Sequence, residues 1–393
     1  MRPFRGITRN VFILGIVSFL TDVSSEMIYP LLPTFLTTVL GASPVFLGLI
    51  EGAAESTAAF MKLVSGAWAD RVRDRTRLVL AGYSLSSFSR PLIAAVTSVG
   101  TVLAIRVTDR IGKGIRSSPR DAIIADSVGP SVRGKAYGFH RAMDHAGAVV
   151  GPLFATGLLA WFVKDLRILF WWAALPGLLA VLVVLLGVRD VAAKTPLPRE
   201  NGRFLLQLPT GTLRTYVLIL LLFTLGNSSD AFLLLRAGQL GTPTAGLPLI
   251  WMMLHVVKML AVMPFGALSD RLGRRGIIVA GWIIYALTYV GFAVATTAWH
   301  TWCLFGLYGL FYGLTEGVER AFLADLAPAT QRGLAFGWYN FVVGVGALPA
   351  GIIFGFLWQR VSPSAAFWWG AVLAAVSACL LLCGGVRNRS STP

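Results

Sequence analysis

The sequence predicts an all-α membrane protein whose twelve transmembrane helices form two pseudo-symmetric six-helix bundles. Three observations support this prediction: an apolar composition, apolar segments of membrane-spanning length, and a repeat that relates the two halves of the chain. Of the 393 residues, 56% are hydrophobic and only 13% are charged. In a soluble domain about 25% of the residues are charged. We therefore exclude a soluble enzyme.

The apolar segments have the length that a bilayer requires. A helix that crosses roughly 30 Å of hydrocarbon needs about 20 residues. On this criterion the predicted spans are 11–38, 44–68, 78–98, 100–124, 136–162, 166–187, 214–236, 246–268, 277–297, 300–324, 334–358 and 364–386.

The distribution of positive charge predicts the orientation. The chain has 34 Lys and Arg against 18 Asp and Glu, a formal net charge of +16. These basic residues gather in the even-numbered loops and at both ends, and positive loops stay on the cytoplasmic side. We expect both termini to be cytoplasmic in a multi-pass protein of the bacterial inner membrane. The positive charge thus reflects topology, and we expect no nucleic-acid partner.

The domain organisation follows from one long polar connection in the middle of the chain. Residues 189–213 contain Pro196, Pro198 and Gly202, which are typical of a linker. We predict an N-terminal six-helix bundle over 1–188, a cytoplasmic linker over 189–213, and a C-terminal six-helix bundle over 214–393.

Three short patterns recur in the same order in both halves, and such self-similarity is typical of duplicated transporter folds. The offset between the two copies is nearly the same each time: 270 − 70 = 200 and 325 − 126 = 199, measured between aspartates, and 228 − 24 = 204, measured between the first serines. The copies are Gly66–Arg71 with Gly266–Arg271, Ala125-Asp126 with Ala324-Asp325, and Ser24-Ser25-Glu26 with Ser228-Ser229-Asp230.

Several motifs resemble those of the major facilitator superfamily. The stretch GALSDRLGRR at 266–275 is similar to that family's loop motif, and GAWADRVRDR at 66–75 is a weaker copy. The fourth span resembles the arginine-bearing motif through Arg106, although Asp109 and Arg110 stand where a glutamine and a glycine are usual. GAVVGP at 147–152 resembles the glycine–proline motif of the family's antiporters.

The resemblance implies a secondary transporter, not an enzyme, that exposes a site alternately to each side of the membrane. It also implies that the loop motif controls the conformational change. The alternative for the basic residues of that motif is a tight turn with cytoplasmic positive charge. The gating candidates are Asp70, Arg71, Asp270, Arg271, Gly147, Gly151 and Pro152.

Ionisable residues inside the spans, together with the polar Asn227, are the candidates for solute or proton binding. A charge deep in a bilayer costs at least about 2.5–3.5 kcal/mol, so such residues are expected to face a cavity or one another. Most lie on spans one, four, seven and ten. The candidates are Asp22, Glu26, Glu51, Glu55, Arg106, Asp109, Arg110, Asp144, Asn227, Asp230 and Glu316.

Two helix faces in the N-terminal bundle are expected to meet. Asp22 and Glu26 share one face because they are four residues apart, and so do Arg106 and Arg110. Both faces lie roughly 15 Å from their ends of the membrane. The hypothesis is that solute or proton shifts the pairing between them, and the alternative is a static ion pair. For proton exchange we slightly prefer Glu26 and Asp230, which occupy equivalent positions.

The function predicted from these residues is proton-coupled export of a small charged or zwitterionic organic solute by a monomer. The proton gradient would drive it without a cofactor or a metal centre, and the other partner is the lipid bilayer. The alternatives are a metal-ion exporter, an uptake symporter of the same fold, and a membrane enzyme. The intramembrane arginines oppose a free metal cation, and the four histidines have no catalytic spacing.

Overall fold

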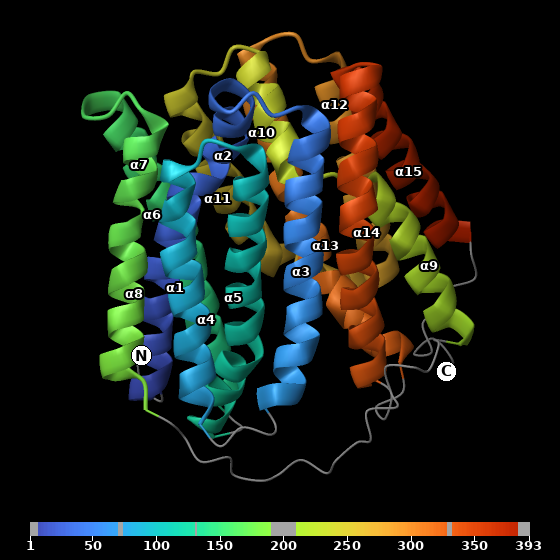
Figure 1. Ribbon diagram of the computed structural model, residues 1–393. Coiled ribbons are helices and arrows are strands. Elements are labelled where there is room, and N and C mark those ends of the chain that lie inside the picture. The colour runs from blue at the N-terminus through green and yellow to red at the C-terminus, as the bar shows by residue number, and fades with distance from the viewer. Residues whose placement is uncertain (1–6, 70–73, 130–131, 190–209, 328–331, 384–393) are drawn as a thin grey trace. The chain divides into compact units, whose positions relative to one another are not determined.

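The computed structural model describes residues 7–69, 74–129, 132–189, 210–327 and 332–383. Within these ranges the chain is almost entirely helical and contains no strand. Twelve helical crossings follow one another along the described residues, each at the place of one predicted span (Figure 1). The predicted fold class is confirmed.

The first six crossings end at Gly187. They comprise α1 (Arg9–Ile28) with the turns η1 (Tyr29–Leu31), α2 (Leu32–Thr34) and η2 (Phe35–Val39), α3 (Pro44–Ala69), α4 (Arg75–Ser89) with η3 (Arg90–Ala95), α5 (Val99–Asp126), α6 (Arg133–Trp161), and α7 (Leu166–Trp172) with α8 (Ala174–Gly187).

The last six crossings begin at Gly211. They comprise α9 (Gly211–Gly226) with α10 (Asp230–Gln239), η6 (Thr244–Gly246) with α11 (Leu247–Leu272), α12 (Arg274–Val294), α13 (Ala298–Leu326), α14 (Arg332–Arg360) and α15 (Pro363–Cys383). Most of the predicted linker, residues 190–209, lies outside the described residues.

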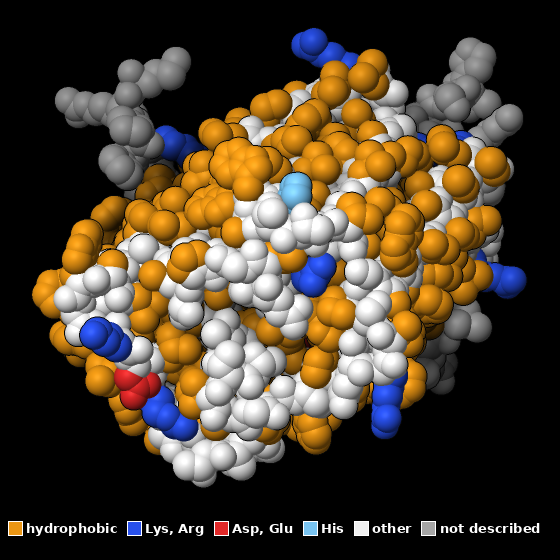
Figure 2. All heavy atoms as spheres, turned by 90° about the horizontal axis from the view of Figure 1, so that it is seen from above, with side chains coloured by type: hydrophobic (Ala, Val, Ile, Leu, Met, Phe, Trp, Pro, Cys, Tyr) orange, Lys and Arg blue, Asp and Glu red, His pale blue; other side chains and the backbone are white. Residues whose placement is uncertain are grey.

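The surface of the helices is apolar, as a lipid environment requires. The side chains of Phe162 and Met263 are 80% and 82% exposed, and soluble proteins rarely expose many such groups together. Figure 2 shows hydrophobic side chains over much of the visible face, with scattered Lys and Arg among them. Within the described residues, seven crossings are long and apolar enough to span a membrane by length and composition alone. Others, such as α5, carry internal charges.

The described chain divides into two compact units whose boundary differs from the predicted one. The first unit holds residues 1–35 and 57–198, and the second holds 36–56 and 199–393. The two parts of α3 therefore belong to different units. Its second part packs on α5 in the first unit, where the Ser65 hydroxyl donates to the Gly114 carbonyl at 2.7 Å. Its first part packs on α14 in the second unit, where Ser56 donates to Gly344.

An ion pair at equivalent positions of the two halves supports the internal duplication. Arg75, at the start of α4, lies 2.7 Å from Asp126, at the end of α5. Arg274, at the start of α12, lies 2.7 Å from Asp325 near the end of α13. The offsets are 274 − 75 = 199 and 325 − 126 = 199. Each pair ties one helix start to the neighbouring helix end within its own unit.

Reversing one charge of the first pair should lower stability. We expect Asp126→Arg to lower the midpoint of thermal unfolding in detergent by about 2–4 °C, or about 1 kcal/mol, because two guanidinium groups would then repel each other. The double variant Arg75→Asp with Asp126→Arg should recover most of the loss. Lys164→Gln, at an exposed loop position, is the control. A double variant as unstable as the single one would contradict the assigned pair.

Candidate solute and proton sites

The seventh crossing is interrupted in its middle. α9 ends at Gly226 and α10 begins at Asp230, so the three residues between them are not helical. The side chain of Ser229 caps α10 by accepting a hydrogen bond from the Ala231 amide. Asp230 thus stands in the first turn of a helix inside the membrane, where the helix dipole favours a negative charge.

Two tyrosines of α12 stabilise this interruption. The Tyr285 hydroxyl lies 3.2 Å from both the carbonyl oxygen of Gly226 and Oδ1 of Asn227. The hydroxyls of Ser228 and Tyr289 are 2.8 Å apart. Non-helical backbone at membrane depth persists only where protein groups serve its polar atoms. The candidate Asn227 therefore has at least a structural role.

The C-terminal polar cluster, which we define as Asp230, Lys258, Tyr308, Tyr312 and Glu316, lies beside this interruption. The Tyr308 hydroxyl donates to Oδ1 of Asp230 at 2.6 Å, and the Tyr312 hydroxyl lies 3.1 and 3.2 Å from its two carboxylate oxygens. Lys258 Nζ is 2.8 Å from Oε2 of Glu316 and 4.6 Å from the Tyr312 ring centroid. Tyr312 thus contacts Asp230 through its hydroxyl and Lys258 through its ring. Lys258 in turn pairs with Glu316.

Glycines of α13 bring α11 close enough to form this cluster. A Cβ atom on Gly309 would lie 2.8 Å from Cβ of Val257, and one on Gly313 would overlap the Ala261 side chain. Small residues allow such close approach between membrane helices. Lys258 stands between Val257 and Ala261 in sequence, so the same contact places it opposite Tyr312.

Glu319, one turn beyond the cluster, has a different environment. It is only 7% exposed and accepts hydrogen bonds from Trp282 Nε1 at 3.0 Å and from the Tyr339 hydroxyl at 2.9 Å. These partners come from α12 and α14. Glu319 therefore links three helices.

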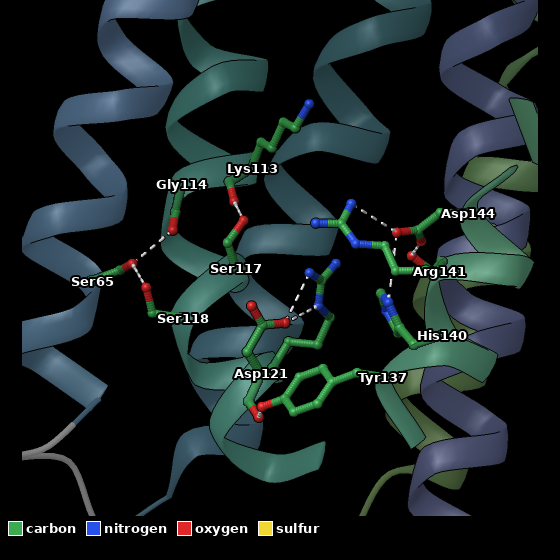
Figure 3. Close-up of polar contacts among 12 residues, drawn as sticks. Ser65, Lys113, Gly114, Ser117, Ser118, Asp121, Tyr137, His140, Arg141 and Asp144 are labelled. Atoms are coloured by element: carbon green, nitrogen blue, oxygen red, sulfur yellow. Dashed lines mark hydrogen bonds and ion pairs between the residues drawn. The ribbon is translucent and has the colours of Figure 1, made fainter. Parts of the chain in front are cut away.

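The N-terminal polar cluster, which we define as Ser18, Asp22, His140, Arg141 and Asp144, lies between α1 and α6. Ser18 donates a hydrogen bond to Oδ1 of Asp144. His140 Nδ1 and Arg141 Nη1 lie 3.6 and 3.8 Å from Oδ2 of Asp144 (Figure 3). Asp22, one turn after Ser18 on α1, interacts electrostatically with Asp144. Two carboxylates from the neighbouring helices α1 and α6 thus interact.

Gly147 and Gly151 allow α6 to approach α1 at the candidate carboxylates. A Cβ atom on Gly147 would lie 2.8 Å from Cβ of Asp22, and one on Gly151 would lie 3.1 Å from Cβ of Glu26. Pro152, also buried, lies within the uninterrupted α6. These residues were predicted to act in gating, and the structure shows that the two glycines position Asp22 and Glu26.

The basic residues of α5 surround a buried ion pair. Asp109 accepts a hydrogen bond from Arg90 of η3 at 2.7 Å, and Arg106 lies 3.8 Å away. Arg90 also donates to the Thr21 carbonyl of α1 at 3.1 Å. Asp109, which stands where the resembled motif usually has a glutamine, thus has a charged partner. This pair ties η3, α5 and α1 together.

The expected contact of Asp22 and Glu26 with Arg106 and Arg110 stays a prediction. On α5, the basic groups that interact electrostatically with Asp22 include Lys113 and Arg116. Arg106 lies over the Tyr29 ring, 5.6 Å from its centroid.

The two glutamates of α3 differ in exposure. Glu51 is buried and Glu55 is exposed. Within the second unit, Glu55 interacts electrostatically with Asp230. Glu55 therefore adds a third negative charge to the surroundings of the C-terminal polar cluster.

Two further gating candidates, Asp270 and Arg271, lie at the end of α11. Asp270 is exposed and lies 3.2 Å from Arg274, the residue that also pairs with Asp325. Arg271 is exposed as well. Gly273 ends α11 with a φ of 94°, a backbone conformation that favours glycine. The equivalent candidates of the first half, Asp70 and Arg71, lie outside the described residues.

Sequence reasoning missed Lys258, Tyr308, Tyr312 and His140 as site residues. A signal for the tyrosines was present, because Tyr308, Tyr312 and Glu316 recur every four residues and each precedes a glycine. That spacing places the three polar side chains on one helix face. Lys258 and His140 had no comparable signal, since their partners lie on other helices.

A family model decides the classification. The model described as Major Facilitator Superfamily matches residues 14–257 and 236–392. The chain belongs to this superfamily. The resemblance of the motifs is thereby confirmed, and members of this family are transporters rather than enzymes. They bind small-molecule solutes within the membrane, so the predicted solute partner is confirmed at that level.

Similar proteins cover nearly the whole chain. An uncharacterised MFS-type transporter of Methanocaldococcus jannaschii is 35% identical, over 96% of this chain and 95% of its own. A sugar efflux transporter A of Dickeya chrysanthemi is 26% identical over 96% of each chain. The crystal structure of a nucleoside transporter, NupG, has a TM-score of 0.77 at 14% identity and covers 95% of this chain and 98% of that one. That structural likeness shows the major facilitator fold alone.

Two glycines of α13 offer a matched test of the helix contact that builds the C-terminal polar cluster. Gly313→Ala should destabilise the protein by about 1–3 kcal/mol, because the added methyl group would overlap Ala261. Gly317→Ala should be neutral or stabilising by about 0.5–1 kcal/mol, because nothing lies within 4 Å of its position and alanine favours a helix. Thermal unfolding in detergent measures both. Equal effects of the two variants would contradict the close contact of α11 with α13.

Proposed function

We propose that this major facilitator transporter exports a small organic solute in exchange for protons. The proposal rests on the carboxylates of Asp22 and Asp144, which come from the neighbouring helices α1 and α6 and interact electrostatically. Two nearby carboxylates repel each other when both are charged, and binding one proton relieves that repulsion. Ser18 and His140 contact Asp144, which keeps one carboxylate oriented while the other exchanges its proton.

The solute, in this proposal, binds at the C-terminal polar cluster. Asp230 and Glu316 offer negative charge, Lys258 offers positive charge, and Tyr312 presents a ring that is partly exposed. Such a combination suits a charged or zwitterionic organic solute. The name of the sugar efflux relative from Dickeya chrysanthemi supports the outward direction.

The remaining parts of the proposal concern the setting. The protein would lie in the bacterial inner membrane as a monomer with cytoplasmic termini, would use the proton gradient and would need no cofactor. The contact of Asp270, at the end of α11, with Arg274, at the start of α12, supports a role of the loop motif in the conformational change, since it joins the two helices that the motif connects. The sequence-based alternatives of metal export and solute uptake gain no specific support. Among the described residues, no group of three or more His, Cys, Asp and Glu side chains is placed to hold a metal ion.

A pH-gradient assay tests proton coupling. Proteoliposomes with an imposed gradient and an internal pH dye should lose the gradient when a transported solute is added from a panel of organic amines, carboxylates and sugars. Asp22→Asn should reduce that solute-dependent loss to the level of protein-free liposomes, because the exchanging carboxylate is removed.

The matched control is Asp165→Asn, at the exposed start of α7. Asp165 caps that helix by accepting a hydrogen bond from the Arg167 amide, and asparagine caps a helix about as well as aspartate. This variant should behave like wild type. Full coupling in Asp22→Asn, or no response of the wild type to the whole panel, would contradict the proposal.

A further inference from the structure

The ammonium group of Lys258 lies between a carboxylate and the face of an aromatic ring. Oε2 of Glu316 lies 2.8 Å from Lys258 Nζ, and the centroid of the Tyr312 ring lies 4.6 Å from the same nitrogen. A carboxylate together with an aromatic face is the usual setting for ammonium recognition in proteins. The same tyrosine holds Asp230 through its hydroxyl, so one ring orients both charges.

The charges around this lysine favour a further cation. Asp230, Glu316 and Glu55 carry three negative charges, and Lys258 supplies one positive charge. An organic ammonium entering the cluster would reduce this imbalance, whereas an anion would increase it.

The cluster is accessible, unlike the neighbouring acid of the same helix. The side chains of Lys258 and Glu316 are 16% and 30% exposed, while Glu319 is 7% exposed and held by Trp282 and Tyr339. Lysine has a flexible four-carbon stem. Its ammonium group can therefore leave Glu316 while the backbone of α11 stays in place.

We propose that the C-terminal polar cluster is a binding site for an organic ammonium, and that Lys258 occupies this site as a tethered substitute when no solute is bound. The solute's ammonium group displaces Lys258 from Glu316 and from the face of Tyr312, while Tyr308 and Tyr312 keep Asp230 in place. This inference rests on the proposed function, because it names the chemical class of the exported solute.

Binding to the purified full-length protein in detergent, at one pH and without a gradient, tests this inference. The probe is N,N-dimethyl-2-phenylethylamine, and 3-phenylpropionate is the matched anion. We expect Lys258→Gln to bind the amine about tenfold more tightly than wild type in calorimetry, because the competing ammonium is gone. Glu316→Gln should lose amine binding, and Lys164→Gln should match wild type.

A chemical measurement on the wild-type protein tests the same displacement without a variant. Acetylation of Lys258, followed by mass spectrometry with Lys164 as reference, should increase when the tertiary amine is present. Reduced acetylation, weaker amine binding in Lys258→Gln, or no amine binding in either protein would overturn the inference. Binding of the anion that depends on Lys258 would overturn it as well.

The two tests fail separately. Coupled transport of anions or sugars together with absent amine binding would leave proton-coupled export standing and reject the ammonium site. Amine binding without a pH-gradient response would leave the ammonium site standing and reject proton-coupled export.

Discussion

A charge in the hydrocarbon core costs at least about 2.5–3.5 kcal/mol unless protein groups surround it, and this constraint shapes the helix contacts described above. Glycines meet neighbouring helices where charges lie: Gly147 at Asp22 in the first unit, and Gly313 beside Lys258 in the second. Close contact shortens the distance between helices and lets carboxylates, hydroxyls and cations reach partners across them. Small residues beside these charged groups thus let the neighbouring helices come close enough to provide their partners.

The duplicated halves share a scaffold but differ at their polar clusters. The pairs Arg75–Asp126 and Arg274–Asp325 occupy equivalent positions. In contrast, Ser24-Ser25-Glu26 lies within the continuous α1, whereas Ser228-Ser229-Asp230 spans the break before α10. Tyrosine hydroxyls of α12 serve the polar groups at this break. In the proposed function, the N-terminal polar cluster exchanges protons and the C-terminal polar cluster binds solute.

The sequence predicted the twelve crossings and the duplication, because hydrophobic length and repeated motifs are properties of the chain alone. It did not predict which charges meet. Asp109 pairs with Arg90, and that contact depends on how α5 turns toward η3, which no local pattern encodes. The break at Ser228 was missed for a similar reason, since the equivalent serines in α1 remain helical. The role of Tyr312 depends on Lys258 of α11, a residue more than fifty positions away.

Counterflow exchange tests most directly the claim that proton exchange and solute binding belong to different clusters. Proteoliposomes loaded with a transported solute and holding no pH gradient exchange it for labelled solute outside, a process that needs binding but no net proton movement. Asp22→Asn should keep exchange near the wild-type rate while losing gradient-driven transport, and Asp230→Asn should lose both. Loss of exchange in Asp22→Asn, or full exchange in Asp230→Asn, would contradict the account.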